Sequence, residues 1–538
     1  MGSGSLTVVL RAGSVAFVLL AFPLMLFGRG PGGRDALLMP AEDSSYAGKI
    51  VARVGPKVIT GKEFLLAYDF GPAFPKREKD SKRRFLQFMI NEKLLALDAQ
   101  EHGGNARPSV IRSVAEIDHD LATEELYRQD VLGKVHISRQ EMEEAVTAQR
   151  IHYSLRWIYA PTRDRIEEVK NGLAAGRPFD SLYHASLVNP AQADDRSWQT
   201  TRFKLMTTRP GVAGVVDTMK PGRTSVPVEG PDGWYIFSLD NISFDAITTE
   251  SDAAQQLHRA SEVLTQHKAD SLSDIYVDKL MREHAPVIER RTFAILCAFL
   301  GQAWLPQDLR TSMLTVLPVD REIAVAAAAN PSPYASDKLV TMSDRAVTLG
   351  RFLAWYNARS TLVKLSTTSG RAFQESLERL IWQMVRDGLL IERAERRHLD
   401  KLAIVKEQKG WWTDKILYAS EKQALSESIA VKDSLLSVYF VAHRARYAHA
   451  KGDTVTFRGA ADEVRRDFVS EKMTSVLFHR LVELRRKYQV TFDEDVLASL
   501  PVDSANDPKA IDVYVAKKGG TFPHPAFPTI DDDWQTWQ

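Results

Sequence analysis

The stretch KIVARVGPKVITGKEFLLAY, residues 49–68, contains a pattern that organises much of the chain. Apolar and polar residues alternate over residues 49–55, which is typical of a strand with one buried face. A Pro-Lys turn separates this strand from a second one that begins at residues 58–59. Thr60 is followed three residues later by Glu63, which is the spacing of a capping box. The stretch therefore predicts two short strands followed by an amphipathic helix.

The same pattern returns nearly two thirds of the way along the chain. Five positions match at constant spacing: Ile59, Thr60, Phe64, Leu65 and Tyr68 correspond to Val347, Thr348, Phe352, Leu353 and Tyr356. The apolar positions of the following helix also match, between residues 85–99 and residues 380–394. Helical periodicity alone is common, but a shared order of strand, turn, Thr cap, helix and helix is not. We therefore expect one supersecondary unit to be used twice.

Between the two copies the periodicity changes to that of a small α+β domain. The expected elements are a strand at 151–159, a helix from Thr162 to Leu173, a helix at 179–187, an edge strand at 224–228 and a final strand at 234–239. Gly176 is placed to end the first of these helices. Pro227 lacks an N–H group and so confines its strand to a sheet edge.

These patterns predict a mainly α protein with an inserted small α+β domain and an N-terminal membrane-anchor helix. The expected division is a signal-anchor or signal peptide at 1–28, a linker at 29–47, an N-terminal helical domain at 48–150, the α+β domain at 151–243, a helical connector at 244–334, a second helical domain repeating the first unit at 335–500, and an extended tail at 501–538.

The α+β segment resembles the parvulin-type peptidyl-prolyl isomerase domain. The motifs that carry the resemblance are Leu155-Arg-Trp-Ile158, Leu173-Ala-Ala-Gly176, Phe179-Asp-Ser-Leu182, Lys220-Pro-Gly222, Ser225-Val-Pro-Val228 and Gly233-Trp-Tyr-Ile236. The helical segments on either side resemble the chaperone regions of the periplasmic SurA-, PpiD- and PrsA-like foldases. The resemblance covers roughly residues 48–500 and implies a folding factor whose clients are unfolded or nascent envelope proteins.

The positions at which parvulins carry their polar site residues differ in this chain. The resemblance implies a His on the first strand, a His on the last strand, and an Asp or Cys after the second helix. The chain has Trp157, Tyr235 and Asn189 at these places. The candidate peptide-binding residues are Trp157, Met206, Val212, Trp234 and Tyr235.

Two functions remain open from the sequence. One is a non-catalytic chaperone that keeps the parvulin fold for binding, with aromatic rings filling the space that two histidines would occupy. The other is an active peptidyl-prolyl cis-trans isomerase with a non-standard site. The substitutions at residues 157, 189 and 235 favour the first.

Composition excludes several other classes of protein. The 538 residues include 70 Lys and Arg and 69 Asp and Glu, for a formal net charge of +1. Nucleic-acid binders normally show a basic excess, so we expect no nucleic-acid partner. Cys297 is the only cysteine, which excludes an intrachain disulfide and cysteine-based metal sites. With no nucleotide-binding glycine motif either, we expect no cofactor and no metal.

The N-terminal region contains an uninterrupted apolar run at residues 12–27, with Arg11 before it and Arg29 after it. The run is at the short end of what a bilayer span requires, which is about 20 residues, and it also matches a signal-peptide core. No clear cleavage site follows it. The expected location is therefore the bacterial inner membrane with the mass facing the periplasm, the alternative being a soluble periplasmic protein after cleavage.

We predict that the mature protein keeps residues 12–27 and fractionates with membranes, because signal peptidase has no good small-residue site there. N-terminal sequencing of the purified protein tests this. A mature N-terminus beyond residue 28 would show that the run is a cleaved signal.

Overall fold

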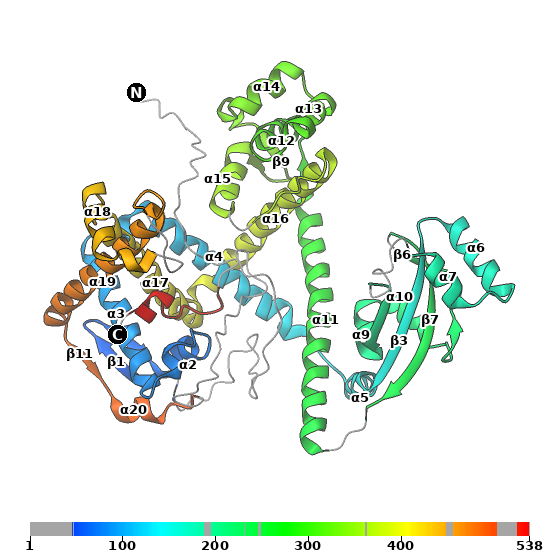
Figure 1. Ribbon diagram of the computed structural model, residues 1–538, viewed down its shortest axis with the longest axis horizontal. Coiled ribbons are helices and arrows are strands. Elements are labelled where there is room, and N and C mark those ends of the chain that lie inside the picture. Colours follow the sequence, from blue (N-terminus) through cyan, green and yellow to red (C-terminus); the bar gives the residue numbers. More distant parts are fainter. Residues whose placement is uncertain are drawn as a thin grey trace. The chain divides into compact units, whose positions relative to one another are not determined.

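A computed structural model describes residues 46, 48–187, 195–230, 232–245, 249–360, 363–447, 456–502 and 525–536. The described residues are mostly helical, with three small antiparallel sheets (Figure 1). They form two compact units, one of residues up to Tyr127 and from Leu280 onward, the other of Arg128–Lys279. No helix among the described residues is both long and apolar enough to cross a membrane. The predicted anchor at 12–27 lies outside the described residues.

The first unit contains both copies of the repeated pattern. Its elements are β1 (Ile50–Val54), β2 (Lys57–Thr60), α2 (Gly61–Asp69), α3 (Ser81–Glu101), most of α4 (Pro108–Asp130), β8 (Val287–Ile288), α12 (Arg290–Trp304), α13 (Gln307–Val316), α14 (Arg321–Ala329), β9 (Lys338–Thr341), β10 (Ala346–Thr348), α15 (Leu349–Arg359), α16 (Gly370–Arg396), α17 (Ala403–Glu427), α18 (Asp433–Ala442), α19 (Ala461–Lys487), β11 (Val490–Phe492), α20 (Glu494–Ser499) and a short 3₁₀ helix, η7 (Asp532–Thr536).

Both copies have the element order expected from the sequence: two strands, a helix and a longer helix. Thr60 caps α2 by accepting a hydrogen bond from the Glu63 N–H at 3.2 Å, and Thr348 caps α15 by accepting one from the Arg351 N–H at 3.3 Å. Each strand pair gains a third strand that the sequence did not indicate. This third strand is β11 beside β1 in the first copy and β8 beside β9 in the second.

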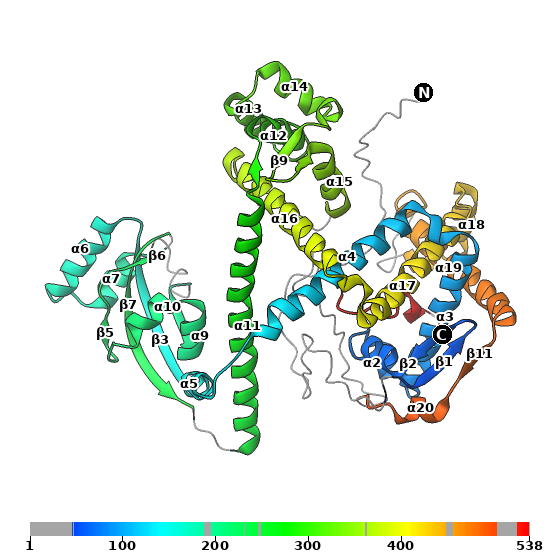
Figure 2. The same cartoon turned by 180° about the vertical axis from the view of Figure 1, so that it is seen from behind.

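The largest core forms where α17 packs along α3, as both views show (Figures 1 and 2). Phe85, Leu94 and Leu95 of α3 are fully buried in it, together with Leu417 and Tyr418 of α17. The expected separate lobes at 48–150 and 335–500 are therefore wrong, because the helices after residue 402 complete the N-terminal core. Amphipathic periodicity shows that a helix has an apolar face but does not show which helix covers it.

Charged side chains are also buried between α3 and α17. Lys93 has only 7% of its side chain exposed, and its Nζ lies 2.8 Å from Glu63 and 2.9 Å from Asp414. Lys57 bonds the same Asp414. The two carboxylates raise the pKa of Lys93 against the opposing effect of burial, so the ammonium stays charged.

The end of the chain departs from the extended tail expected at 501–538. Within it, residues 525–536 pack against the first unit, and Ile530 and Trp534 are buried. The proline-rich composition suggested an unfolded segment, but large apolar side chains between the prolines and aspartates gain a partner surface that the sequence alone does not reveal.

Ion pairs connect α4 to the second copy of the repeat. Glu116 pairs with Arg359 of α15, and His119 lies 3.4 Å from Glu395 of α16.

Asp387 of α16 is buried, and Arg386 donates two hydrogen bonds to its Oδ1. Burial raises the pKa of Asp387 to about 6, which the neighbouring guanidinium only partly offsets.

The second unit is built on one sheet of strand order β4-β3-β7-β5, with β6 also paired to β7. Its elements are α5 (Arg139–Gln149), β3 (Ile151–Ala160), α6 (Arg163–Ala174), α7 (Phe179–Ala185), β4 (Ser197–Thr201), α9 (Arg202–Thr208), α10 (Pro210–Val216), β5 (Arg223–Thr224), β6 (Val228–Gly230), β7 (Gly233–Phe244) and most of α11 (Glu250–His284). The expected edge strand at 224–228 is divided into β5 and β6 around Pro227, and β4 was not predicted. Gly176 ends α6 with a φ of 85°, as expected for a C-terminal glycine.

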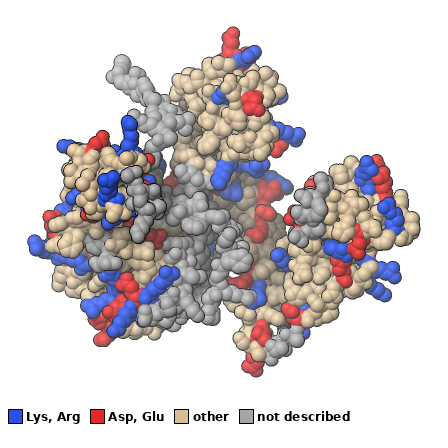
Figure 3. Space-filling view, viewed as in Figure 1, with Lys and Arg blue, Asp and Glu red and all other residues tan. Residues whose placement is uncertain are grey.

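Helices cover both faces of this sheet. Ile158 and Ile236 face α6 and α7 in one cluster, whereas Leu155 and Leu239 face α9 and α10 in another. Acidic and basic side chains are intermixed on the surface seen in Figure 3, as the near-zero net charge leads one to expect.

We predict that Lys93→Met lowers the free energy of unfolding of the first unit by roughly 3 kcal/mol, because it leaves the buried Glu63 without its cation and leaves the partly buried Asp414 with Lys57 alone. Urea unfolding followed by circular dichroism measures the change. Arg371→Ala is the control, since it breaks an exposed pair with Glu375 and should cost less than about 1 kcal/mol. Equal effects of the two variants would show that the buried cluster does not stabilise the unit.

We also predict that Asp387→Asn changes how stability depends on pH. The pKa of Asp387 is about 6 in the folded chain and 3.8 as its ordinary value, so the folded state binds the extra proton between these values. Stability is therefore lost as pH rises through this window, by roughly 3 kcal/mol in the wild type, and the loss disappears in the variant. Unfolding midpoints measured from pH 4 to pH 7 test this, with the exposed Asp433→Asn as control. Parallel wild-type and Asp387→Asn profiles would contradict it.

Candidate functional site

Four aromatic side chains line one face of the central strand pair in the second unit. Trp157 and Tyr159 lie two residues apart on β3, and Tyr235 and Phe237 lie two residues apart on β7, so each pair shares a face. The antiparallel register places Trp157 opposite Phe237 and Tyr159 opposite Tyr235. We refer to these four residues as the aromatic strip.

The rings of the aromatic strip contact one another in sequence. The ring centroids are 6.4 Å apart for Trp157 and Phe237, 6.0 Å for Phe237 and Tyr235, and 5.3 Å for Tyr235 and Tyr159. Phe237 is buried and the other three rings are partly exposed. The strip is thus one row of contacting rings, of which Trp157, Tyr159 and Tyr235 are partly exposed.

The strip continues the face that α9 and α10 cover. Tyr153, Leu155 and Leu239 are further along the same strands and pack against those two helices. The side-chain alternation of β3 and β7 therefore places the aromatic strip on the same face as these residues, beyond the part that α9 and α10 cover.

The polar groups nearest the strip are already engaged with each other. The Tyr235 hydroxyl donates to the Asp232 carboxylate at 2.5 Å, and the Tyr159 hydroxyl donates to the Asp232 carbonyl at 2.7 Å. Burial, followed by the bond to Asp232, raises the pKa of Tyr235 to about 12. Tyr235 is therefore a neutral phenol at neutral pH, and its proton is directed at Asp232 rather than at a ligand.

The structure separates the other predicted site residues from this surface or leaves them untested. Trp234 lies on the opposite face of β7, in the cluster under α6, where Arg163 stacks on it at 5.3 Å. It therefore does not share a surface with Tyr235. Val212 packs at the edge of the cluster under α10, and Met206 is exposed on α9. Asn189 lies outside the described residues.

The sequence prediction missed Tyr159 and Phe237, which complete the strip. The signal was present, because each lies two positions along a strand from a residue that was predicted, and strand side chains alternate between faces. Only the register of β3 against β7 shows that the four rings form one row.

A group of three potential metal ligands occurs in the described part of the first unit: Asp98, His102 and Glu421. Arg480 already binds both oxygens of Asp98 at 2.6 Å, and Arg107 donates to Glu421 at 3.2 Å. The guanidinium groups supply the positive charge that these carboxylates require. The group is therefore an ion-pair network rather than a cation site.

No protein-family profile matches the chain, and no curated protein is similar to it. Among solved structures it is similar to a peptidylprolyl isomerase, PrsA, from Bacillus cereus, with 14% identity, 44% of this chain and 92% of that chain covered, and a TM-score of 0.23. It is also similar to the foldase protein PrsA from Streptococcus pneumoniae, with 14% identity, coverage of 40% and 86%, and a TM-score of 0.21. With TM-scores this low, these similarities indicate neither the fold nor the function of this chain.

Proposed function

We propose that the protein is an extracytoplasmic folding factor that binds unfolded or extended polypeptides and has little or no peptidyl-prolyl isomerase activity. The observation that carries this proposal is the aromatic strip, a row of four rings that includes Trp157 and Tyr235, the two positions where the parvulin resemblance implies histidines. The order of strands and helices around the strip agrees with that resemblance.

The proposed lack of catalysis follows from what prolyl isomerisation requires. The barrier of roughly 18–20 kcal/mol arises from amide resonance, so a catalyst must favour the twisted amide over the planar one. Aromatic rings stack on a prolyl ring about equally well in both states, which strengthens binding without lowering the barrier. The Tyr235 hydroxyl would have to donate a hydrogen bond to the amide in order to favour its twisted form. In the structure this hydroxyl donates to Asp232 instead.

The proposed location is the periplasmic side of a bacterial inner membrane, with residues 12–27 as the anchor and a soluble periplasmic protein as the alternative. The support for it is the apolar run itself together with the foldase resemblance of the chain that follows. The proposed partners are unfolded or nascent envelope proteins and, through the N-terminal run, the membrane.

We predict that residues 48–538 suppress aggregation of an unfolded client. They should leave the cis-trans relaxation time of a short X-Pro peptide near its uncatalysed value of roughly tens to hundreds of seconds. Trp157→Ala should weaken client binding about five-fold, the equivalent of ~1 kcal/mol of lost aromatic contact. Light scattering of the client and spectroscopic relaxation of the peptide are the two measurements.

Trp234→Ala is the matched control, because it removes the same side chain from the opposite face of the same sheet. It should leave client binding within about two-fold of the wild type if the fold is kept, which circular dichroism checks. Equal losses for the two variants would remove the strip as the binding surface. Isomerisation at the rate of an efficient parvulin would establish the active enzyme instead.

A further inference from the structure

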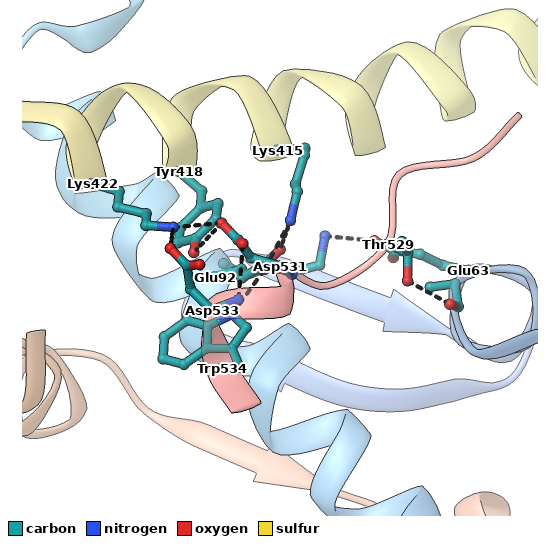
Figure 4. Close-up of polar contacts among 11 residues, drawn as sticks. Glu63, Glu92, Lys415, Tyr418, Lys422, Thr529, Asp531, Asp533 and Trp534 are labelled. Atoms are coloured by element: carbon teal, nitrogen blue, oxygen red, sulfur yellow. Dashed lines mark hydrogen bonds and ion pairs between the residues drawn. The ribbon is translucent and has the colours of Figure 1, made fainter. Parts of the chain in front are cut away.

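A groove in the first unit is occupied by the end of the chain itself (Figure 4). Its walls are α2, α3 and α17, and its occupant is residues 525–536, which we call the tail segment. Residues 528–531 have no regular secondary structure, and η7 follows. The tail segment is therefore held mainly by what its side chains and backbone contact on the walls.

Glu92 of α3 is the polar centre of the groove. Its Oε1 accepts from the Asp531 backbone N–H at 2.7 Å and from the Trp534 indole N–H at 2.9 Å. Lys415 of α17 donates to both Glu92 oxygens at 2.8 Å. Lys415 belongs to the wall, so Glu92 keeps its counter-ion whether or not the tail segment is present. The two N–H donors come only from the occupant.

A second lysine of α17 faces the acidic side of the tail segment. Lys422 bonds Asp531 at 2.7 Å and also bonds Asp533, and the Tyr418 hydroxyl donates to Asp531 at 3.1 Å. Figure 4 shows Tyr418 and Lys422 extending from α17 toward these aspartates. The groove is therefore complementary in charge to an acidic segment.

Aromatic contacts fix the two ends of the tail segment. Trp534 stacks on Phe88 with ring centroids 5.6 Å apart, and Phe527 stacks on Phe70 at the same distance. Trp411 of α17 and Leu66 of α2 lie in the cluster that buries Phe527. Between these anchors the fit is looser, because a cavity of about 40 Å³ remains beside residues 528–530.

The walls also contact each other directly. Lys93 of α3 bonds Asp414 of α17 at 2.9 Å, and buried aliphatic and aromatic side chains of both helices share one core. Walls that are joined by contacts of their own would keep more of their shape when the occupant leaves, which would lower the free-energy cost of binding an extended ligand.

We propose that this groove is a peptide-binding site, that the tail segment is its resident occupant, and that it accepts from other polypeptides an extended acidic segment with a tryptophan three residues after an aspartate. The indole N–H and a backbone N–H would satisfy Glu92, and the acidic side chains would pair with Lys422. This site is distinct from the aromatic strip, and its test uses neither a client protein nor an isomerase assay.

The test uses the full-length chain and cuts it at one introduced site. A specific protease sequence is inserted within residues 503–524, the folded protein is cleaved, and exchange of its C-terminal fragment for a fluorescent peptide of residues 525–538 is followed by anisotropy. Peptides with Trp534→Phe, which removes the indole N–H together with part of the stacked ring, and with Gln535→Ala, an exposed position, are compared with the wild-type peptide.

We expect saturable binding of the wild-type peptide, at least ten-fold weaker binding of the Trp534→Phe peptide, and binding of the Gln535→Ala peptide within two-fold of the wild type, since a hydrogen bond to a charged group is the stronger kind. Three results would overturn the proposal: no exchange under excess peptide, loss of the circular dichroism signal when the fragment leaves, or equal affinity of the two variant peptides. Aggregation suppression that fails while peptide exchange succeeds would count against the proposed function alone.

Discussion

The packing of α17 on α3 is the contact on which the first unit depends. Lys93 and Asp414 meet across this interface although they are 321 residues apart in sequence. Burying a lysine between two carboxylates is tolerable only when all three groups stay within bonding distance, so the cluster restricts how the helices can meet. Apolar burial along both helices supplies the driving force, and the ions restrict its geometry.

That contact makes the two copies of the repeat interlock. The helix that follows the first copy, α4, forms ion pairs with α15 and α16 of the second copy. The helix that follows the second copy, α17, returns to α3 of the first. Neither copy forms a closed lobe, and the segment between Tyr127 and Leu280 is accommodated as a compact unit of its own.

In the second unit, the fold decides which positions of β3 and β7 share a face, and the side chains at those positions decide its chemistry. Strand pairing and register bring the same positions of β3 and β7 together on one face, whatever side chains occupy them. In this chain those positions carry a row of aromatic rings, which suits the binding of apolar segments but does not favour one amide geometry over another. The same fold with imidazoles at these positions would have a different chemistry.

The groove in the first unit and the aromatic strip in the second unit offer different kinds of surface. The strip presents rings, and the nearest hydroxyls are engaged internally. The groove combines aromatic contacts with a buried carboxylate and two lysines, so it discriminates by charge and by donor position. A folding factor with both surfaces would hold apolar and acidic aromatic segments by separate means.

Local patterns in the sequence were sufficient for local structure. The Thr60 and Thr348 caps, the Gly176 helix end and the order of elements in both copies follow from spacing and backbone preference, which act over a few residues. Pairings between distant segments were decided only in three dimensions. Four features depend on which surfaces meet: the third strands β8 and β11, the position of α17, the row that Tyr159 and Phe237 complete, and the binding position of Trp534. Apolar burial is non-directional, so a sequence shows that a face will be covered, whereas only shape and charge complementarity in the folded chain select its partner.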